Sequence, residues 1–122
     1  MKKLICHCGE VELEIKESGG ALNKFLRCNC TLCKKKGYIM TFAPITDVKI
    51  TKGEDKLKLY QYHTKVAEHH FCSACGIYTH HKMRSRPDTF GLNVGCIDDI
   101  DQFKLENVGL NDGQNHPMDQ KK

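Results

Sequence analysis

The sequence has little of what builds a large or membrane-embedded core. It has no tryptophan, only three prolines, and 7% aromatic residues in a chain of 122. No apolar run is long enough to span a bilayer, and the first residues carry two lysines without the apolar stretch of a signal peptide. We therefore expect one small domain over residues 1–122, located in the cytoplasm.

Strong charge of one sign is also missing. The formal net charge is +4, and the lysines are scattered in short runs such as Lys34-Lys35-Lys36. A protein that tracks nucleic acid usually carries a longer basic stripe. We expect neither a membrane nor a nucleic acid as the main partner, and the sequence says nothing about the oligomeric state.

Cysteine, by contrast, is abundant and clustered. Seven of the eight cysteines lie in three short segments, and only Cys96 lies outside them. The segments are Cys6-His7-Cys8, Cys28-Asn29-Cys30-Thr31-Leu32-Cys33 and Cys72-Ser73-Ala74-Cys75. Because cytosolic thiols stay reduced, clusters of this kind bind metal more often than they form disulfides.

The rest of the sequence is typical of strands and turns. Alternation of apolar and polar residues predicts strands at 11–15, 48–51 and 56–59, and the turn residues 52–55 predict that the last two pair as a hairpin. We expect further strands and two short helical segments, and we expect residues from about 111 onward to be loosely ordered. These further strands are expected at 76–80 and 90–94, and the helical segments after Cys30 and near 99–103. The predicted fold class is mainly β.

The first and third clusters predict one shared zinc. A Cys-x-Cys or Cys-x-x-Cys turn can present both sulfurs to one ion, and the adjacent Gly9 and Gly76 let the backbone bend around it. Four thiolates form the usual shell of a structural Zn²⁺, whose binding free energy then contributes to folding. The alternative is four independent thiols. The predicted ligands are Cys6, Cys8, Cys72 and Cys75.

The middle cluster offers three sulfurs, from Cys28, Cys30 and Cys33. Three ligands are one short of a tetrahedral shell, so this zinc would keep a position open for chemistry. Three thiolates leave the ion a weak Lewis acid but able to deprotonate an incoming thiol, which favours thiol chemistry. A closed Cys₃His site is the alternative, with the fourth ligand from one of four histidines: His69, His70, His80 or His81.

Three motifs resemble those of the glutathione-dependent formaldehyde-activating enzyme family, which includes relatives of centromere protein V. They are Cys6-His7-Cys8-Gly9-Glu10-Val11, Cys28-Asn29-Cys30-Thr31-Leu32-Cys33 and Phe71-Cys72-Ser73-Ala74-Cys75-Gly76. Weaker similarity at 93–98 and 112–115 extends the resemblance over nearly the whole chain. It implies an Mss4-like fold of antiparallel β-sheets around zinc sites, with few short helices.

The resemblance also implies roles for the cysteines. The first and third clusters would hold a structural zinc, and Cys28, Cys30 and Cys33 would hold a catalytic zinc, giving two Zn²⁺ per chain. The activity implied is the condensation of glutathione with formaldehyde to S-hydroxymethylglutathione. Asn29 departs from the family pattern, in which many relatives carry histidine, and this affects the surroundings of the zinc rather than its ligands.

Several other residues receive no functional role from the sequence. We interpret Cys96 as a packing thiol, and His7 as a neighbour of ligands rather than a ligand. The run Lys34-Lys35-Lys36 follows the open site and could attract the carboxylates of glutathione, but lysines on a solvated turn are common. Aromatic residues in a small domain belong to the core more often than to a pocket wall, so we interpret five of them as core. They are Tyr38, Phe42, Tyr60, Tyr62 and Phe71. No general acid is identified.

The sequence therefore predicts a zinc-dependent carbon-sulfur lyase-type enzyme. It would reversibly join glutathione, or a similar thiol, to formaldehyde or another small aldehyde, with its chemistry at Cys28, Cys30 and Cys33. The main alternative is a non-enzymatic zinc module that binds a protein or nucleic acid. A thiol-disulfide oxidoreductase using Cys72 and Cys75 is a third possibility.

Overall fold

The computed structural model describes residues 2–16, 22, 24–61, 65, 67–83 and 86–111. Within these residues ten strands form two sheets, with one short α-helix and four 3₁₀ turns, so the predicted mainly β, Mss4-like class is confirmed. Within the described residues no helix is long and apolar enough to cross a membrane. The C-terminal segment that we expected to be loosely ordered lies almost entirely outside the described residues.

The smaller sheet has three antiparallel strands in the order β1-β2-β5. Its strands are β1 (Lys2–Ile5), β2 (Glu12–Ile15) and β5 (Val48–Lys52). On β2 the alternation of charged and apolar residues buries Leu13 and Ile15 completely, while Glu12 and Glu14 stay partly exposed. The predicted strand at 11–15 is therefore confirmed.

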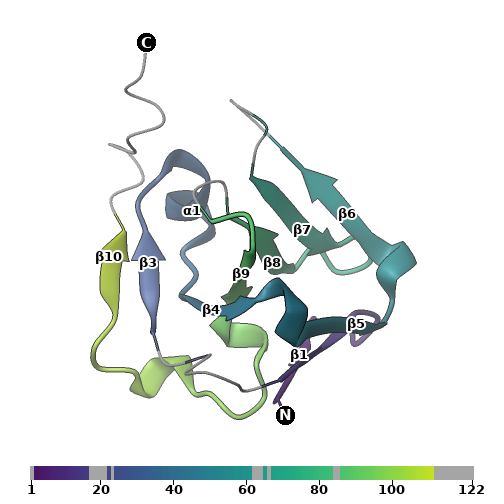
Figure 1. The fold of residues 1–122 in the computed structure, drawn as a ribbon, viewed down its shortest axis with the longest axis horizontal. Helices are drawn as coiled ribbons and strands as arrows, with labels where there is room; N and C mark the ends of the chain where they lie inside the picture. Colours follow the sequence, from purple (N-terminus) through teal and green to yellow (C-terminus); the bar gives the residue numbers. More distant parts are fainter. Residues whose placement is uncertain are drawn as a thin grey trace.

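The larger sheet has seven strands in the order β10-β3-β4-β9-β8-β7-β6 (Figure 1). All described pairs are antiparallel except β10 with β3, which is parallel. The strands are β3 (Leu26–Cys28), β4 (Met40–Pro44), β6 (Leu57–Tyr60), β7 (Glu68–Cys72), β8 (Tyr78–Lys82), β9 (Thr89–Asn93) and β10 (Gly109–Asn111). Figure 1 shows β10 and β3 at one side of the molecule and β6 at the other.

The predicted hairpin between 48–51 and 56–59 is wrong. Both segments are strands, but β5 pairs with β2 in the small sheet, and β6 pairs with β7 in the large one. Between them, Gly53 at φ +77° and the 3₁₀ turn η2 (Glu54–Lys56) carry the chain from one sheet to the other. Alternation shows which face of a strand is buried, but it does not specify the partner strand.

Helical structure is short, as predicted. The helix α1 (Thr31–Lys36) follows Cys30 directly and ends at Gly37, which has φ +64°. The other segment, expected near 99–103, is the 3₁₀ turn η4 (Gln102–Lys104). The remaining turns are η1 (Ile45–Asp47) and η3 (Val94–Cys96).

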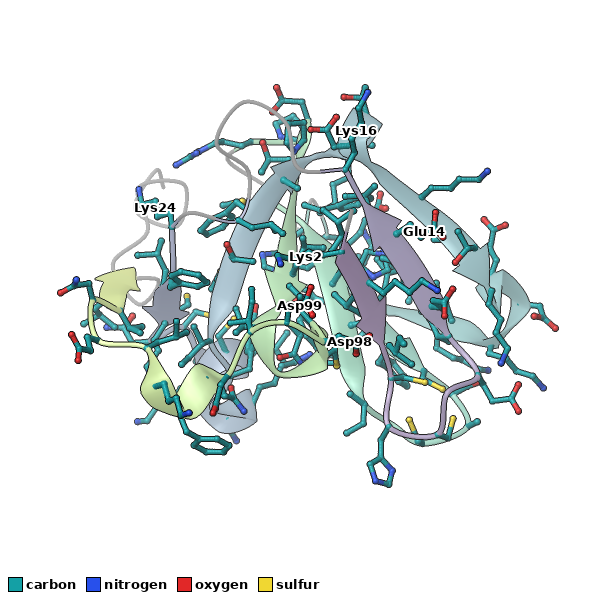
Figure 2. All side chains as sticks on the ribbon, turned by 90° about the horizontal axis from the view of Figure 1, so that it is seen from below. Lys2, Glu14, Lys16, Lys24, Asp98 and Asp99 are labelled. Carbon is teal, nitrogen blue, oxygen red and sulfur yellow. The ribbon has the colours of Figure 1, made fainter. Side chains whose placement is uncertain are left out.

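The strand β1 also contacts the turn that follows η3. Leu4 forms a β-bridge with Ile97, and the Asp98 amide donates to the Lys3 carbonyl oxygen at 3.2 Å. At the surface the Lys2 ammonium donates to Asp99 Oδ2 at 3.2 Å, and Figure 2 shows these side chains next to each other. The N-terminal strand is thus held by residues late in the chain.

Buried residues form two clusters, and each contains one group of cysteines. The larger one packs the small sheet against the large sheet and includes Cys6 and Cys72. The smaller one contains Cys33, Tyr38, Met40 and Tyr78, with Cys28 and Cys30 packed against it. The two cysteine sites therefore lie in different parts of the core.

Candidate metal centres

Two similar turns build the four-cysteine site. In the first, the Gly9 amide donates to the Cys6 carbonyl oxygen at 3.2 Å, and in the second the Gly76 amide donates to the Cys72 carbonyl oxygen at 2.7 Å. Both glycines have positive φ, +81° and +78°, which residues with a side chain rarely adopt. Each turn brings two cysteine side chains to one point, as the spacing predicted.

The structure brings these two turns together although 64 positions separate Cys8 from Cys72. The sulfurs of Cys6, Cys8, Cys72 and Cys75 all lie within 4.8 Å of one another. The Cys6 and Cys8 sulfurs are 3.6 Å apart, and the Cys8 and Cys72 sulfurs 3.7 Å apart. A tetrahedron with Zn–S bonds of about 2.3 Å has S–S edges of about 3.8 Å, so this donor set fits zinc.

The backbone supports this site as well. The Val11 amide donates to the Cys6 sulfur at 3.3 Å. Hydrogen bonds of this kind spread the negative charge of a thiolate and orient it toward a cation. Cys6 and Cys72 are buried, whereas Cys8 is exposed, so the site lies at the edge of the core.

The middle cluster lies where β3 meets α1. Cys28 ends β3, Cys30 caps the helix by accepting a 3.3 Å hydrogen bond from the Cys33 amide, and Cys33 is the buried residue of the helix. Their three sulfurs lie within 4.8 Å of one another, and no histidine nitrogen of the described residues joins this group. The local sequence thus assembles a three-sulfur site without help from distant segments.

The proximity of these thiols has an electrostatic consequence. Hydrogen bonds with the Cys28 and Cys30 thiols, together with burial, raise the pKa of the Cys33 thiol far above its usual range. Three thiolates at this distance repel each other unless a cation compensates them. Three soft sulfur donors suit zinc among the common divalent ions, so this donor set also fits the predicted metal.

A buried polar cluster lies beside the middle site. The Tyr38 hydroxyl is 3.8 Å from the Cys33 sulfur, donates to the Tyr78 hydroxyl at 3.4 Å, and lies 3.3 Å from His81 Nδ1. The Tyr78 hydroxyl in turn lies 3.1 Å from His69 Nδ1. All four side chains are buried. We call Tyr38, Tyr78, His69 and His81 the tyrosine-histidine cluster.

Strand pairing explains how the histidines reach this place. The dipeptides His69-His70 on β7 and His80-His81 on β8 pair as His69 with His81 and His70 with His80. Each pair is stacked, with ring centroids 5.4 Å and 4.6 Å apart. Neighbouring residues of a strand face opposite sides, so one pair faces the middle cysteines and the other lines a separate cavity of about 450 Å³.

Burial keeps these histidines uncharged near neutral pH. It lowers the pKa of His69 to about 4, and lowers the pKa of His80 and of His81 to about 3. Their rings therefore act as neutral hydrogen-bonding groups. The resulting surroundings of the middle site are polar but carry little charge of their own.

Among the described residues, Lys36 brings a positive charge to this region. Lys36 lies one turn after Cys33 on α1, its side chain is partly buried, and its ammonium nitrogen is 3.2 Å from the centroid of the Tyr78 ring. Lys34 and Lys35 are exposed. Burial lowers the pKa of Lys36 to about 8. The three lysines that looked equivalent in the sequence therefore have different environments.

The sequence missed most of this cluster. Tyr38 was assigned to the core, and nothing distinguished Tyr78 or separated His69 and His81 from the other two candidate histidines. The paired dipeptides were the available signal, because two adjacent antiparallel strands place such residues opposite each other. Cys96 is a half-buried thiol, and burial raises its pKa to about 12, which agrees with a packing role.

The fold and the cysteine clusters together define a class of small β proteins with closely spaced thiols that could hold metal ions. A family model described as "Glutathione-dependent formaldehyde-activating enzyme" matches residues 1–108. The chain belongs to this family, so the resemblance seen in its cysteine motifs is confirmed.

A solved structure supports the same relationship. A crystal structure of a Rhodobacter sphaeroides protein, determined in a structural genomics programme, superposes with a TM-score of 0.83. Its sequence is 38% identical, and the alignment covers 89% of this chain and 99% of that one. The fold described above is therefore shared over nearly the entire length of both chains.

Proposed function

We propose that this protein is a zinc-dependent carbon-sulfur lyase-type enzyme that reversibly joins glutathione to formaldehyde. A similar thiol or another small aldehyde would react in the same way. Membership of a formaldehyde-activating family supports this reaction class. The single observation that carries the proposal is the group of three clustered sulfurs, which no other candidate ligand among the described residues joins, so that one tetrahedral position is left for an outside ligand.

Cys28, Cys30 and Cys33 would hold the catalytic zinc. When bound, the ion would supply a soft acceptor at which a substrate thiol loses its proton and stays nucleophilic at neutral pH. The family assignment and the tetrahedral fit together support a second, structural zinc at Cys6, Cys8, Cys72 and Cys75. The protein would work in the cytoplasm, where glutathione is abundant.

The chain's own residues would orient the reacting groups. The Cys33 amide donates to the Cys30 sulfur, and the Tyr38 hydroxyl contacts the Cys33 sulfur, so both ligands are held in fixed directions. The neutral His81 and His69 rings hold Tyr38 and Tyr78 in place through their Nδ1 atoms. These neutral rings therefore orient the two hydroxyl groups without adding charge of their own.

Cobalt substitution tests the thiol-binding step. With Co²⁺ in the middle site, glutathione should change the sulfur-to-metal charge-transfer absorption, because its thiolate enters the coordination shell. S-methylglutathione has the same peptide groups without an ionisable thiol, so it should change the absorption far less. Equal changes with both compounds would contradict binding through sulfur.

The reaction itself is tested by NMR exchange spectroscopy. The protein should speed the equilibration of glutathione and formaldehyde with S-hydroxymethylglutathione above the spontaneous rate, without a coupling enzyme. A thiol-dependent absorption change without faster exchange would leave a glutathione-binding protein and remove the formaldehyde activity. Absence of both effects would favour the non-enzymatic zinc module.

A further inference from the structure

Lys36 carries a positively charged side chain into the region of the middle cysteine site, where the proposed reaction needs a proton donor. Lys36 follows Cys33 by three residues, so both side chains lie on the same face of α1. Its ammonium group is fixed over the ring of Tyr78, a member of the tyrosine-histidine cluster. The exposed Lys34 and Lys35 on the same helix have no such contact among the described interactions.

The middle site with a bound zinc would carry excess negative charge, which this ammonium group can offset. Three thiolates and one divalent ion carry a net charge of −1, and a fourth thiolate makes it −2. The nearby Cys33 and Cys30 stabilise the charged form of Lys36 once they are ionised. An ammonium group beside such a site offsets part of the excess negative charge, and it can donate a proton where charge develops during the reaction.

Addition of a thiol to an aldehyde needs such a donor. As the C–S bond forms, the electron pair of the C=O double bond moves onto oxygen, and this oxygen must receive a proton to give the hydroxymethyl product. The neighbouring polar groups are poor donors, because the histidines are neutral and the Tyr38 hydroxyl donates to Tyr78.

We propose that the ammonium group of Lys36 donates this proton to the aldehyde oxygen, an inference that rests on the function proposed above. Nζ passes one proton to the oxygen and becomes a neutral amine, which takes up from solvent the proton that the substrate thiol released. In the reverse direction the amine accepts the hydroxyl proton while the C–S bond breaks. An ammonium group has three N–H donors, so the contact with the Tyr78 ring leaves donors free for the oxygen.

Burial supports this role. It brings the pKa of Lys36 to about 8, near the pH at which a cytosolic enzyme works, and a general acid is most effective when its pKa is close to the working pH. A rival role is to bind a carboxylate of glutathione, and the experiment separates the two.

The test compares Lys36→Met with Lys35→Met in the zinc-loaded protein. Both variants lose one positive charge from the same helix, but only Lys36 contacts the Tyr78 ring. Exchange rates are measured with glutathione and with 2-mercaptoethanol, a thiol that has no carboxylate. Lys36→Met should lower the maximal rate by roughly 100-fold with both thiols, whereas Lys35→Met should stay within about twofold of the wild type.

Lys36→Arg distinguishes proton donation from charge. It keeps the positive charge, but a guanidinium group does not give up a proton under these conditions, so the rate should remain low. In the wild type the forward rate should fall as the pH rises above about 8, and this fall should be absent in Lys36→Arg. Full activity of Lys36→Arg would overturn the proposal.

A readout independent of activity completes the test. Competitive acetylation over a range of pH, followed by mass spectrometry, reports the titration of each lysine, and Lys36 should titrate well below the pKa of a free lysine side chain. Glutathione should still change the cobalt absorption in Lys36→Met, because thiol binding does not need this residue. Loss of that change would make Lys36 a binding residue and overturn its role as donor.

The outcomes also separate this inference from the function on which it rests. If the wild type does not speed exchange, the proposed function fails, and the donor role falls with it. If the wild type is active and Lys36→Met is equally active, the function stands and Lys36 is not the donor. A loss confined to a higher KM for glutathione, absent with 2-mercaptoethanol, would identify Lys36 as a carboxylate-binding residue instead.

Discussion

Gly91 shows how a residue without a side chain shapes the neighbourhood of the middle site. It lies on β9 directly opposite His81 on β8. A Cβ atom at this position would overlap the imidazole ring of His81, so the ring lies across the glycine. Such cover of a strand glycine by a cross-strand ring is a recurring packing arrangement. It leaves His81 Nδ1 in reach of the Tyr38 hydroxyl.

Gly91→Ala should therefore destabilise the protein by forcing the His81 ring away from Tyr38. Overpacking of this kind costs about 1–3 kcal/mol, which urea unfolding measures. In a His81→Ala background the same substitution should cost less, because the clashing ring is gone. Gly95→Ala is the control and should cost less, since a Cβ atom there would lie 3.2 Å from the end of the Gln102 side chain and 3.4 Å from that of Asn93 instead of overlapping a ring. Equal costs of Gly91→Ala with and without His81 would contradict this account.

The three consecutive lysines show that identical neighbouring residues can have different environments in the folded protein. In sequence Lys34, Lys35 and Lys36 are alike, and together they looked like a solvated turn. In the structure, the helical repeat turns Lys36 to the side of Cys33 and leaves the other two in solvent. One residue of the run thereby acquires a chemical environment that its neighbours lack.

At the scale of elements, a buried histidine of the β7–β8 strand pair predicts how the stability of the protein depends on pH. His80 is 1% exposed, its Nδ1 lies 2.8 Å from the Thr79 hydroxyl, and it faces away from the middle cysteines. Burial lowers its pKa from 6.5 to about 3. As the pH falls below 6.5, the unfolded chain takes up a proton at this residue while the folded chain does not, so the folded state loses stability.

Replacing His80 by asparagine should remove this contribution. In the wild type, His80 should make the free energy of unfolding about 2 kcal/mol lower at pH 5 than at pH 8, because the unfolded state gains a proton and the folded state does not. The stability difference between pH 8 and pH 5 should therefore be smaller in His80→Asn than in the wild type, as measured by urea unfolding. Both proteins lose metal at low pH, so comparing their two stability differences cancels this shared effect. Identical pH dependence would show that His80 is protonated in the folded state.

At the scale of the whole molecule, the two cysteine sites connect the chain in different ways. The four-cysteine site joins the loop between β1 and β2 to the turn after β7, and two of its residues belong to the main core. The middle site uses three residues within one short segment. We therefore expect the first to contribute to folding and the second to act locally.

Single substitutions should separate the two roles. Cys72→Ser removes a sulfur from the site that joins distant segments, so we expect lost or badly impaired folding. Cys30→Ser should leave a folded protein that has lost activity. Thermal melts measure the first effect, and elemental analysis should find two zincs per wild-type chain and about one in Cys30→Ser.

Two outcomes would contradict this division. Equal disruption of folding by Cys72→Ser and Cys30→Ser would leave the structural and catalytic assignments without support. One zinc or none in a freshly purified, unchelated wild type would overturn the two-site scheme. A value between one and two would still agree with it, because a three-thiolate site with an exchangeable ligand loses its metal more readily.

Local features of this protein could be read from its sequence. The strand at β2, the short helix after Cys30 and the two glycine-ended cysteine turns depend on alternation, capping and backbone bending within a few residues. The grouping of seven cysteines as four and three could also be predicted, because zinc sites need a fixed number of ligands. The required number of ligands predicts that the distant first and third clusters meet, although it says nothing about the sheets.

Contacts between distant strands were decided only by the tertiary structure. Alternating residues at 48–51 and 56–59 predicted strands but not their partners, so β5 and β6 were wrongly paired with each other. For the same reason Tyr38, Tyr78, His69 and His81 could not be recognised as one cluster, since their meeting depends on which strands lie side by side. Short-range geometry is encoded by neighbouring residues, whereas strand pairing depends on the packing of the whole chain.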